Sequence, residues 1–489
     1  MKKVRDNVGQ YERQGKGTGS AVSLASVGII YMVILPWLVY QKGAGAAWIG
    51  IGCFGATLLL WHLDSYRLLR FSLQQKEMTL PGFVSRRFGE KTPVLRILLA
   101  SLLILVLISV SVLLLYGIAL FAREVFGSEM YYVAIGVILI SVGFYFLVGK
   151  SGLRTLERWI SILMLFSLVA LNLSIFRVLG TTKILENIFH SWAAGSVSEY
   201  VNIGFMSGKR LGVMEILSLF SFGLILLGNP VPMQRFMQTD RARTIHRSRR
   251  WAIIFSLFAM FLSILLGGML RASLYPAKIN SVTDLFRWIM VEDRGRGFLF
   301  HLTGITFVVS AAVLAVSLFH TCILQITQTF HENILPSLIR RNKRRRKQHT
   351  WVFTLVLIIM EILICAASLV CGEWIYRLTL YSALILSAGL APSIILALNY
   401  QRMTATGFMS GFLGGILTAT LWMFGNWIPQ GEAMVTMEEL TGLNAVIPGM
   451  TFGFLLGILG SRLSKEPSKE IVEAYEEVKY RLVSSEKDG

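Results

Sequence analysis

Long blocks of apolar residues, separated by short polar segments, run through most of this chain. Clear examples are residues 104–121, 251–266 and 352–370. A helix needs about 20 mainly apolar residues to cross a bilayer core of about 30 Å. The pattern predicts about twelve membrane helices, at residues 19–41, 45–64, 94–122, 130–148, 158–178, 211–231, 251–272, 298–335, 351–371, 374–399, 405–427 and 443–462.

The composition supports an all-α integral membrane protein. Hydrophobic residues make up 54% of the chain and charged residues 15%, whereas a soluble protein carries about a quarter charged residues. The net charge is +19, which in a soluble protein would suggest a nucleic-acid partner. Here 35 of the 47 Lys and Arg residues fall in segments on one side of the predicted membrane, as the positive-inside rule expects of the cytoplasmic side.

This charge distribution predicts a multi-pass protein of the inner or plasma membrane with both termini in the cytoplasm. The first 18 residues are polar and basic, unlike a cleaved signal peptide. The basic cluster at 340–347 lies between two predicted helices. We therefore expect it to face the cytoplasm, and we expect the lipid bilayer rather than nucleic acid as a partner.

Signatures of soluble enzymes are absent from the sequence. The chain has no GxxxxGK[ST], HExxH or GxSxG motif, which argues against ATP-driven transport and against a hydrolase. Its four cysteines, Cys53, Cys322, Cys365 and Cys371, lack metal-ligand spacing and lie in or beside apolar segments. We predict no enzymatic activity, no disulfide framework and no cofactor.

Ionisable side chains inside a bilayer cost about 2.5–3.5 kcal/mol each on insertion scales, so those present are functional candidates. Three lie within predicted helices: Glu215, His320 and Glu361. Each also has a structural interpretation, because Glu215 is near its helix start, and the other two can form buried hydrogen bonds. If transport is coupled to protons, these residues are the predicted carriers.

Helix-breaking residues mark the first and the sixth predicted helix. The first contains Gly28 and Pro36, and the sixth contains Gly228, Pro230 and Pro232. Two prolines so close together do not support an unbroken helix. Discontinuous first helices of two inverted five-helix halves form the substrate and ion sites of many secondary transporters, and these two helices occupy corresponding positions.

The last two predicted helices carry small residues at four-residue spacing, at Gly407, Gly411, Gly415, Gly449, Gly453 and Gly457. Such a helix face allows close backbone approach. It predicts either packing of these two helices on each other or a dimer face, and the sequence leaves the oligomeric state open.

Two motifs resemble segments of the sodium:solute symporter family. Residues 79–89, TLPGFVSRRFG, are similar to the family's cytoplasmic TLPDFLxxRFG segment, and residues 228–250 are similar to its GQPxxxxRFM segment. The resemblance implies ten core helices in two inverted repeats, plus peripheral helices, and alternating access driven by sodium. It divides the chain into a basic cytoplasmic N-terminus (1–18), the transporter core (19–399), two peripheral helices (400–462) and a cytoplasmic tail (463–489).

The resemblance also implies a sodium site. The matching positions are the backbone carbonyls of Leu24 and Val27 and the hydroxyl of Ser317. The family has a second hydroxyl directly after the first, and this chain has Leu318 there. One oxygen ligand is therefore lost, which weakens the expected affinity for sodium.

Two further positions depart from the family pattern. An acidic residue of the first helix of proline symporters falls at Ser26, and an acidic residue near the start of the fifth core helix falls at Glu157 or, with a shift of one residue, at Arg158. A cation at the latter position would repel sodium.

We therefore predict a secondary active symporter that imports a small polar solute, such as an amino acid or a carboxylate, driven by sodium. Candidate pocket residues from helix placement are Ser26, Tyr31, Tyr116, Ser221 and Asn229. Alternatives that remain open are a proton-coupled or uncoupled transporter of the same fold and a transporter-derived solute sensor, whereas no constellation of residues supports a membrane enzyme.

Overall fold

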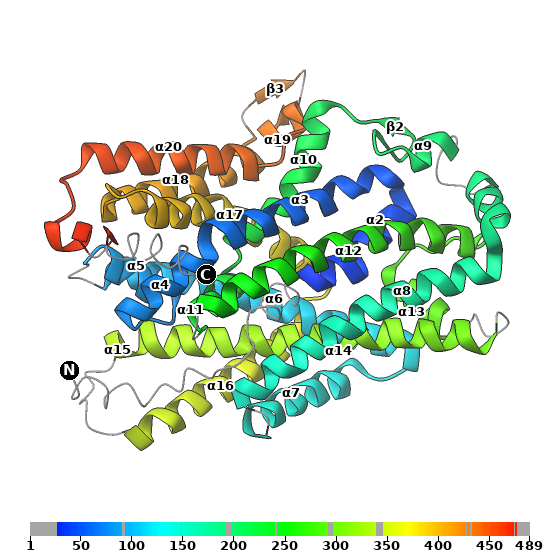
Figure 1. Ribbon diagram of the computed structural model, residues 1–489, viewed down its shortest axis with the longest axis horizontal. Helices are drawn as coiled ribbons and strands as arrows, with labels where there is room; N and C mark the ends of the chain where they lie inside the picture. Colours follow the sequence, from blue (N-terminus) through cyan, green and yellow to red (C-terminus); the bar gives the residue numbers. More distant parts are fainter. Residues whose placement is uncertain are drawn as a thin grey trace.

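The computed structural model describes residues 27–89, 93–147, 149–190, 197–239, 242–291, 297–338, 346–426, 428–430, 433–473 and 475–476. Long helices run side by side and form the body of the molecule (Figure 1). Two short β-hairpins, β1 with β2 and β3 with β4, are antiparallel and connect helices. Residues 340–345 of the basic cluster and the end of the tail lie outside the described residues.

The helices and strands of the first part of the chain are η2 (Ile30–Ile34), α2 (Leu35–Lys42), η3 (Ala44–Ala46), α3 (Ala47–Leu59), η4 (Leu60–Asp64), α4 (Ser65–Gln75), α5 (Leu80–Arg87), α6 (Val94–Phe126), α7 (Met130–Leu147), α8 (Gly149–His190), α9 (Val197–Val201), β1 (Phe205–Met206) and β2 (Lys209–Arg210).

Those of the second part are α10 (Val213–Leu224), η5 (Ile225–Gly228), α11 (Pro230–Met237), α12 (Ala242–Leu274), α13 (Val282–Val291), α14 (Phe298–Thr329), η7 (Phe330–Ile334), α15 (Leu335–Leu338), α16 (Arg346–Val370), α17 (Trp374–Asn399), α18 (Ala405–Phe424), β3 (Ile428–Gln430), β4 (Ala433–Val435), α19 (Met437–Thr441) and α20 (Val446–Leu463).

Within the described ranges, ten helical segments are long and apolar enough to cross a membrane. Two shorter apolar helices, Val27–Lys42 and Met130–Phe146, accompany them. Their positions match the predicted apolar blocks, because burial in lipid requires apolar side chains on every helix face. The total of twelve crossings stays a prediction.

The segment between residues 64 and 93, for which the sequence analysis predicts no helix, is helical over most of its length. The chain continues as α4, whose residues Leu68, Leu69 and Phe71 are buried on one side. It then forms α5, where the Thr79 hydroxyl accepts a hydrogen bond from the Gly82 amide as an N-cap. Both helices are amphipathic, so a search for continuously apolar blocks passes over them.

The sixth predicted helix is broken, as its prolines and glycines indicate. It divides into α10, the 3₁₀ segment η5 and α11, with Asn229 in an extended conformation between the last two. The first helix differs from expectation, because its described part from Val27 has a π-helical segment, η2, directly before Pro36 rather than an extended break. A π segment absorbs the hydrogen bond that proline cannot make.

Another π segment, η7, precedes Pro336, so the eighth long helix continues to Leu338 instead of ending at this proline.

The glycine faces of α18 and α20 pack against each other (Figure 1). A Cβ atom added at Gly411 would lie 2.8 Å from the Gly453 carbonyl oxygen, and one added at Gly407 would lie 1.8 Å from the Ser461 hydroxyl. This confirms the prediction of packing within the chain, because only glycine permits so close a backbone approach.

Candidate functional site

The break between α10 and α11 lies against α17. A Cβ atom at Gly228 would lie 2.4 Å from the Ser387 Cα, so only glycine fits there. The Ser387 hydroxyl donates to the Ile225 carbonyl oxygen over 2.7 Å. The Asn229 side chain accepts a hydrogen bond from the Val231 amide over 2.9 Å and begins α11. The break is thus held by side chains that satisfy the freed backbone groups.

Glu157 is the centre of a buried polar cluster between α8, α11 and α14. Its side chain is 1% exposed and pairs with Arg235 of α11 through both carboxylate oxygens. Thr321 of α14 donates to Glu157 Oε1 over 3.0 Å, and the Ser317 hydroxyl lies 3.5 Å from the same oxygen. A buried carboxylate is stable only with such partners.

The cluster contains Glu157 and not its neighbour Arg158. Glu157 faces the protein interior, whereas Arg158 is only half-buried. The acidic residue, not the cation, therefore occupies the inner position beside Ser317. Arg235, which the sequence analysis did not single out, lies within the second family motif at residues 228–250.

The structure describes two of the three predicted sodium ligands. Val27 and Ser317 are each 4% exposed, and Leu24 lies outside the described residues. A Cβ atom at Gly28 would lie 2.6 Å from the Leu314 side chain of α14 and 3.2 Å from the Met164 sulfur of α8. The first helix thus packs one turn from Ser317 on α14 and two turns from Glu157 on α8.

Within the part of the chain that the structure describes, the predicted pocket residues form no hydrogen bonds with one another. Ser26 lies outside it, and Tyr116 is half-buried. Ser221 donates to Ser218 of its own helix, and Asn229 caps α11. Tyr31 is fully buried, and its hydroxyl has no hydrogen-bond partner among the residues described.

The three predicted proton carriers separate into two places. Glu215 is at the start of α10, where its carboxylate accepts from the Gly212 amide over 2.7 Å and pairs with Lys209 over 2.9 Å. This is the helix-start role that its position indicated. His320 and Glu361 instead meet through Ser141 of α7, a residue that the sequence analysis missed.

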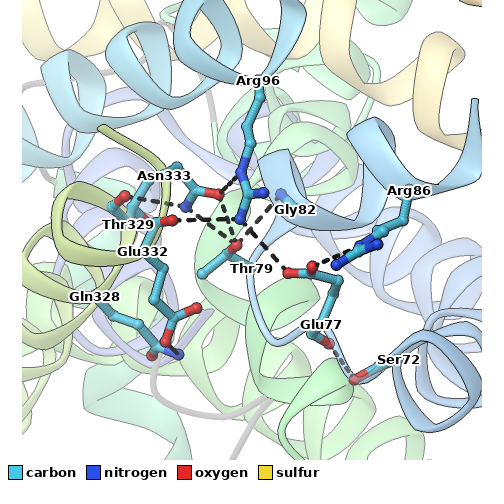
Figure 2. Close-up of polar contacts among 10 residues, drawn as sticks. All are labelled: Ser72, Glu77, Thr79, Gly82, Arg86, Arg96, Gln328, Thr329, Glu332 and Asn333. Carbon is cyan, nitrogen blue, oxygen red and sulfur yellow. Dashed lines mark hydrogen bonds and ion pairs between the residues drawn. The ribbon is translucent and has the colours of Figure 1, made fainter. Parts of the chain in front are cut away.

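The first family motif forms a polar network beside the long helices. Figure 2 shows Asn333 of η7 between Thr79 and Arg96. The Asn333 amide donates to the Thr79 hydroxyl over 3.1 Å, and Arg96 Nε donates to Asn333 Oδ1 over 2.8 Å. Arg96 and Arg86 also pair with Glu77, over 3.7 and 3.1 Å. The network ties the α4–α5 connection to α6 and η7.

A second contact extends this network to the broken helix. The Ser72 hydroxyl of α4 lies 2.5 Å from the Glu77 carbonyl oxygen (Figure 2). The same hydroxyl lies 2.7 Å from the Met237 carbonyl oxygen at the end of α11. The side-chain amide of Gln238 donates to Gln328 Oε1 of α14 over 2.9 Å. Helices of both halves therefore meet at this end of the molecule through polar side chains.

The first helix of one half contains a π segment, and the first helix of the other half is broken. Such irregular helices beside buried polar clusters, within a bundle of membrane helices, are typical of secondary transporters. The model of the sodium:solute symporter family matches residues 15–415, and the chain belongs to this family. It is a membrane symporter and not an enzyme. The sodium/proline symporters of Staphylococcus aureus strains JH9 and Newman are each 25% identical to it over 484 residues, covering 95% of this chain and 89% of theirs.

Solved structures show the same fold. A Na⁺-coupled sialic acid symporter in a substrate-bound outward-open state superposes with a TM-score of 0.69 at 15% identity, over 92% of this chain and 90% of that one. The inward-facing conformation of Mhp1 gives a TM-score of 0.52 at 15% identity, over 94% and 95%. The core is therefore the inverted-repeat transporter fold that the sequence predicted.

Proposed function

We propose that this chain imports a small polar solute, such as an amino acid or a carboxylate, by alternating access with sodium as the coupling ion. The observation that carries the proposal is the buried Glu157 carboxylate beside the Ser317 hydroxyl, close to where the first helix packs on α14. Hard cations take oxygen ligands. Here a hydroxyl and a negative charge occur together, and the first helix packs about one turn away on α14.

In this proposal the Ser317 hydroxyl and the carbonyls of Leu24 and Val27 hold sodium, and Glu157 supplies negative charge. Arg235 neutralises Glu157 when no sodium is bound. A sodium ion beside Ser317 competes with the Arg235 guanidinium for Glu157, because both cations are attracted to the same carboxylate. Since Arg235 is on α11, this competition links ion binding to the position of the broken helix.

The solute would bind beside the same breaks, among Ser26, Tyr31, Tyr116, Ser221 and Asn229. Tyr31 has the best support, because a buried hydroxyl without a partner among the described residues is costly unless a ligand or water satisfies it. The names of the Staphylococcus aureus relatives make proline the first solute to test.

The test is uptake by proteoliposomes that contain the purified full chain. Labelled proline, then a panel of other amino acids and small carboxylates, is offered with an inward sodium gradient or an equal potassium gradient. We expect sodium-stimulated uptake of at least one solute. Ser317→Ala should weaken apparent sodium affinity by about tenfold or more, because a cation site loses an oxygen ligand.

The matched control is Ser310→Ala. Ser310 is also buried on α14, but its hydroxyl bonds to carbonyls of its own helix and lies 3.0 Å from the Ser167 hydroxyl. The Ser310→Ala variant should keep the apparent sodium affinity of the wild type. Equal losses in both variants, or uptake that ignores sodium, would contradict the proposed site.

A further inference from the structure

A second buried polar cluster connects α7, α14 and α16. The Ser141 hydroxyl lies 2.7 Å from His320 Nδ1 and donates to Glu361 Oε1 over 2.5 Å. Ser141 and Glu361 have no exposed surface, and His320 is 2% exposed. Glu361 Oε2 is buried and has no hydrogen-bond partner among the described residues. The sodium site proposed above does not use any of these groups.

We propose that Glu361, Ser141 and His320 form a proton-binding site, whose proton is bound and released as α7 and α16 change their packing on α14. The proposal rests on the chain's proposed function as a transporter and adds a second ion to it. The ligand is the proton, because the cluster offers titratable groups joined by a hydroxyl. Among the described residues no group of three or more His, Cys, Asp or Glu side chains is arranged to hold a metal.

Counting protons shows why the site holds one. Because Ser141 donates to Glu361, its oxygen accepts from the His320 Nδ1–H. A neutral imidazole with an ionised Glu361 would leave an uncompensated anion inside the membrane, which costs several kcal/mol. Adding one proton, on Glu361 Oε2 or on the imidazole, makes the cluster neutral overall. No bond between heavy atoms forms or breaks.

The surrounding charges favour Glu361 as the carrier. The Arg235 guanidinium of α11 donates to the hydroxyl of Thr321, the residue directly after His320 on α14, over 2.5 Å, and a nearby cation disfavours an imidazolium. Within about two turns of the cluster on its own three helices, the other titratable residues are Cys322 of α14, Cys365 of α16, and Tyr145 of α7, which stacks on Phe353. They are neutral near pH 7 in their ordinary state and supply no counter-charge.

The place of the cluster connects it with the transport cycle. α7 and α16 are the fourth helices of the two repeats, and both pack on α14 and on each other (Figure 1). His320 follows Ser317 by three residues on α14. Release of the proton leaves a buried anion, so it requires water to reach Glu361. That occurs only in a conformation where these helices separate.

Infrared spectroscopy of the full chain in lipid nanodiscs tests the site without any solute. The C=O stretch of protonated carboxyl groups is followed from about pH 5 to about pH 9, the range in which His and shifted carboxyl groups titrate. We expect Glu361→Gln to remove one protonated-carboxyl band. Ser141→Ala should keep that band but move its frequency, because the hydrogen-bond partner is lost.

The matched control is Asp64→Asn, which removes another fully buried carboxyl group of the membrane helices and should leave the Glu361 band unchanged. Glu361→Gln keeps the shape and polarity of the side chain, which limits damage to folding. Identical wild-type and Glu361→Gln spectra over the whole pH range would overturn the proposal. So would a Glu361 band that Ser141→Ala does not move.

A transport measurement separates this proposal from the proposed function. With equal sodium on both sides, an inward proton gradient should stimulate proline uptake by the wild type, and Glu361→Gln should lose this stimulation. A Glu361 band in the spectra without sodium-driven uptake of any solute would support the proton site and contradict the sodium proposal. Stimulation that persists in Glu361→Gln would overturn the proton site.

Discussion

At the scale of single residues, the cluster around Glu157 is held by its ion pair. Arg235 contacts both carboxylate oxygens, and its side chain is only 10% exposed. Buried charges of this kind are tolerated only as a pair, because either one alone loses its hydration without compensation. The pair therefore fixes α11 against α8.

Replacing one member of this pair should be strongly destabilising. We expect Glu157→Leu to lower the free energy of unfolding by about 3–5 kcal/mol, because it leaves the Arg235 charge buried alone. The double variant Glu157→Leu, Arg235→Leu should recover much of that loss. Thermal and denaturant unfolding of the purified variants measures both effects.

The comparison variant is Arg86→Ala, which breaks an ion pair with Glu77 in which Arg86 is 64% exposed. An exposed pair contributes about 1 kcal/mol or less. If Glu157→Leu is no more harmful than Arg86→Ala, or if the double variant is worse than the single one, the pair does not stabilise the fold in this way.

The sequence indicated which residues were unusual but not which would meet. His320 and Glu361 stood out because they interrupt apolar helices. Ser141 did not, since a serine is unremarkable in a membrane helix, and it is 220 residues from Glu361 along the chain. Glu157 and Arg235 are 78 residues apart. Such contacts depend on how helices pack, which local patterns do not encode.

At the scale of elements, the C-terminal tail packs on the body of the molecule at Tyr475. The Tyr475 ring lies 4.8 Å from the Arg87 guanidinium of α5, and Phe71 and Phe88 also face this cation. Arg87 is 2% exposed and donates to the Ala397 carbonyl oxygen over 3.1 Å. Burial lowers the pKa of Arg87 to about 10. The tail thus covers a buried cation.

This contact predicts different effects for two substitutions of the same tyrosine. Tyr475→Ala should lower the melting temperature, because loss of a desolvated cation–π contact costs about 2 kcal/mol. Tyr475→Phe should be close to wild type, since it keeps the ring and loses only a 3.4 Å hydrogen bond to Leu398. Scanning fluorimetry compares them, and equal losses would show that the ring does not stabilise Arg87.

The elements themselves were largely predictable, with physical exceptions. Continuous apolar blocks predicted the membrane helices, and Pro230 and Pro232 predicted the break before α11. The amphipathic helices α4 and α5 were missed because they are half polar. The π segments before Pro36 and Pro336 were missed because a proline is compatible with either a break or a local change of helix type.

At the scale of the whole molecule, the two buried clusters are joined by α14. Thr321 and Ser317 contact Glu157, and His320 contacts Ser141. A change in how α14 packs on α8, α7 and α16 therefore affects both sites. The network around Asn333 and Arg96 joins the end of the same long helix to α5 and α6 (Figure 2). Family membership makes alternating access the expected use of these links.

The measurement that tests the central claim most directly is the simultaneous entry of radioactive sodium and labelled solute into the same proteoliposomes. We predict that both enter together in a fixed ratio and that potassium does not replace sodium. When the sodium concentration is equal on both sides, an inward solute gradient should drive sodium entry. Solute entry without sodium, at the same rate in potassium, would contradict the account.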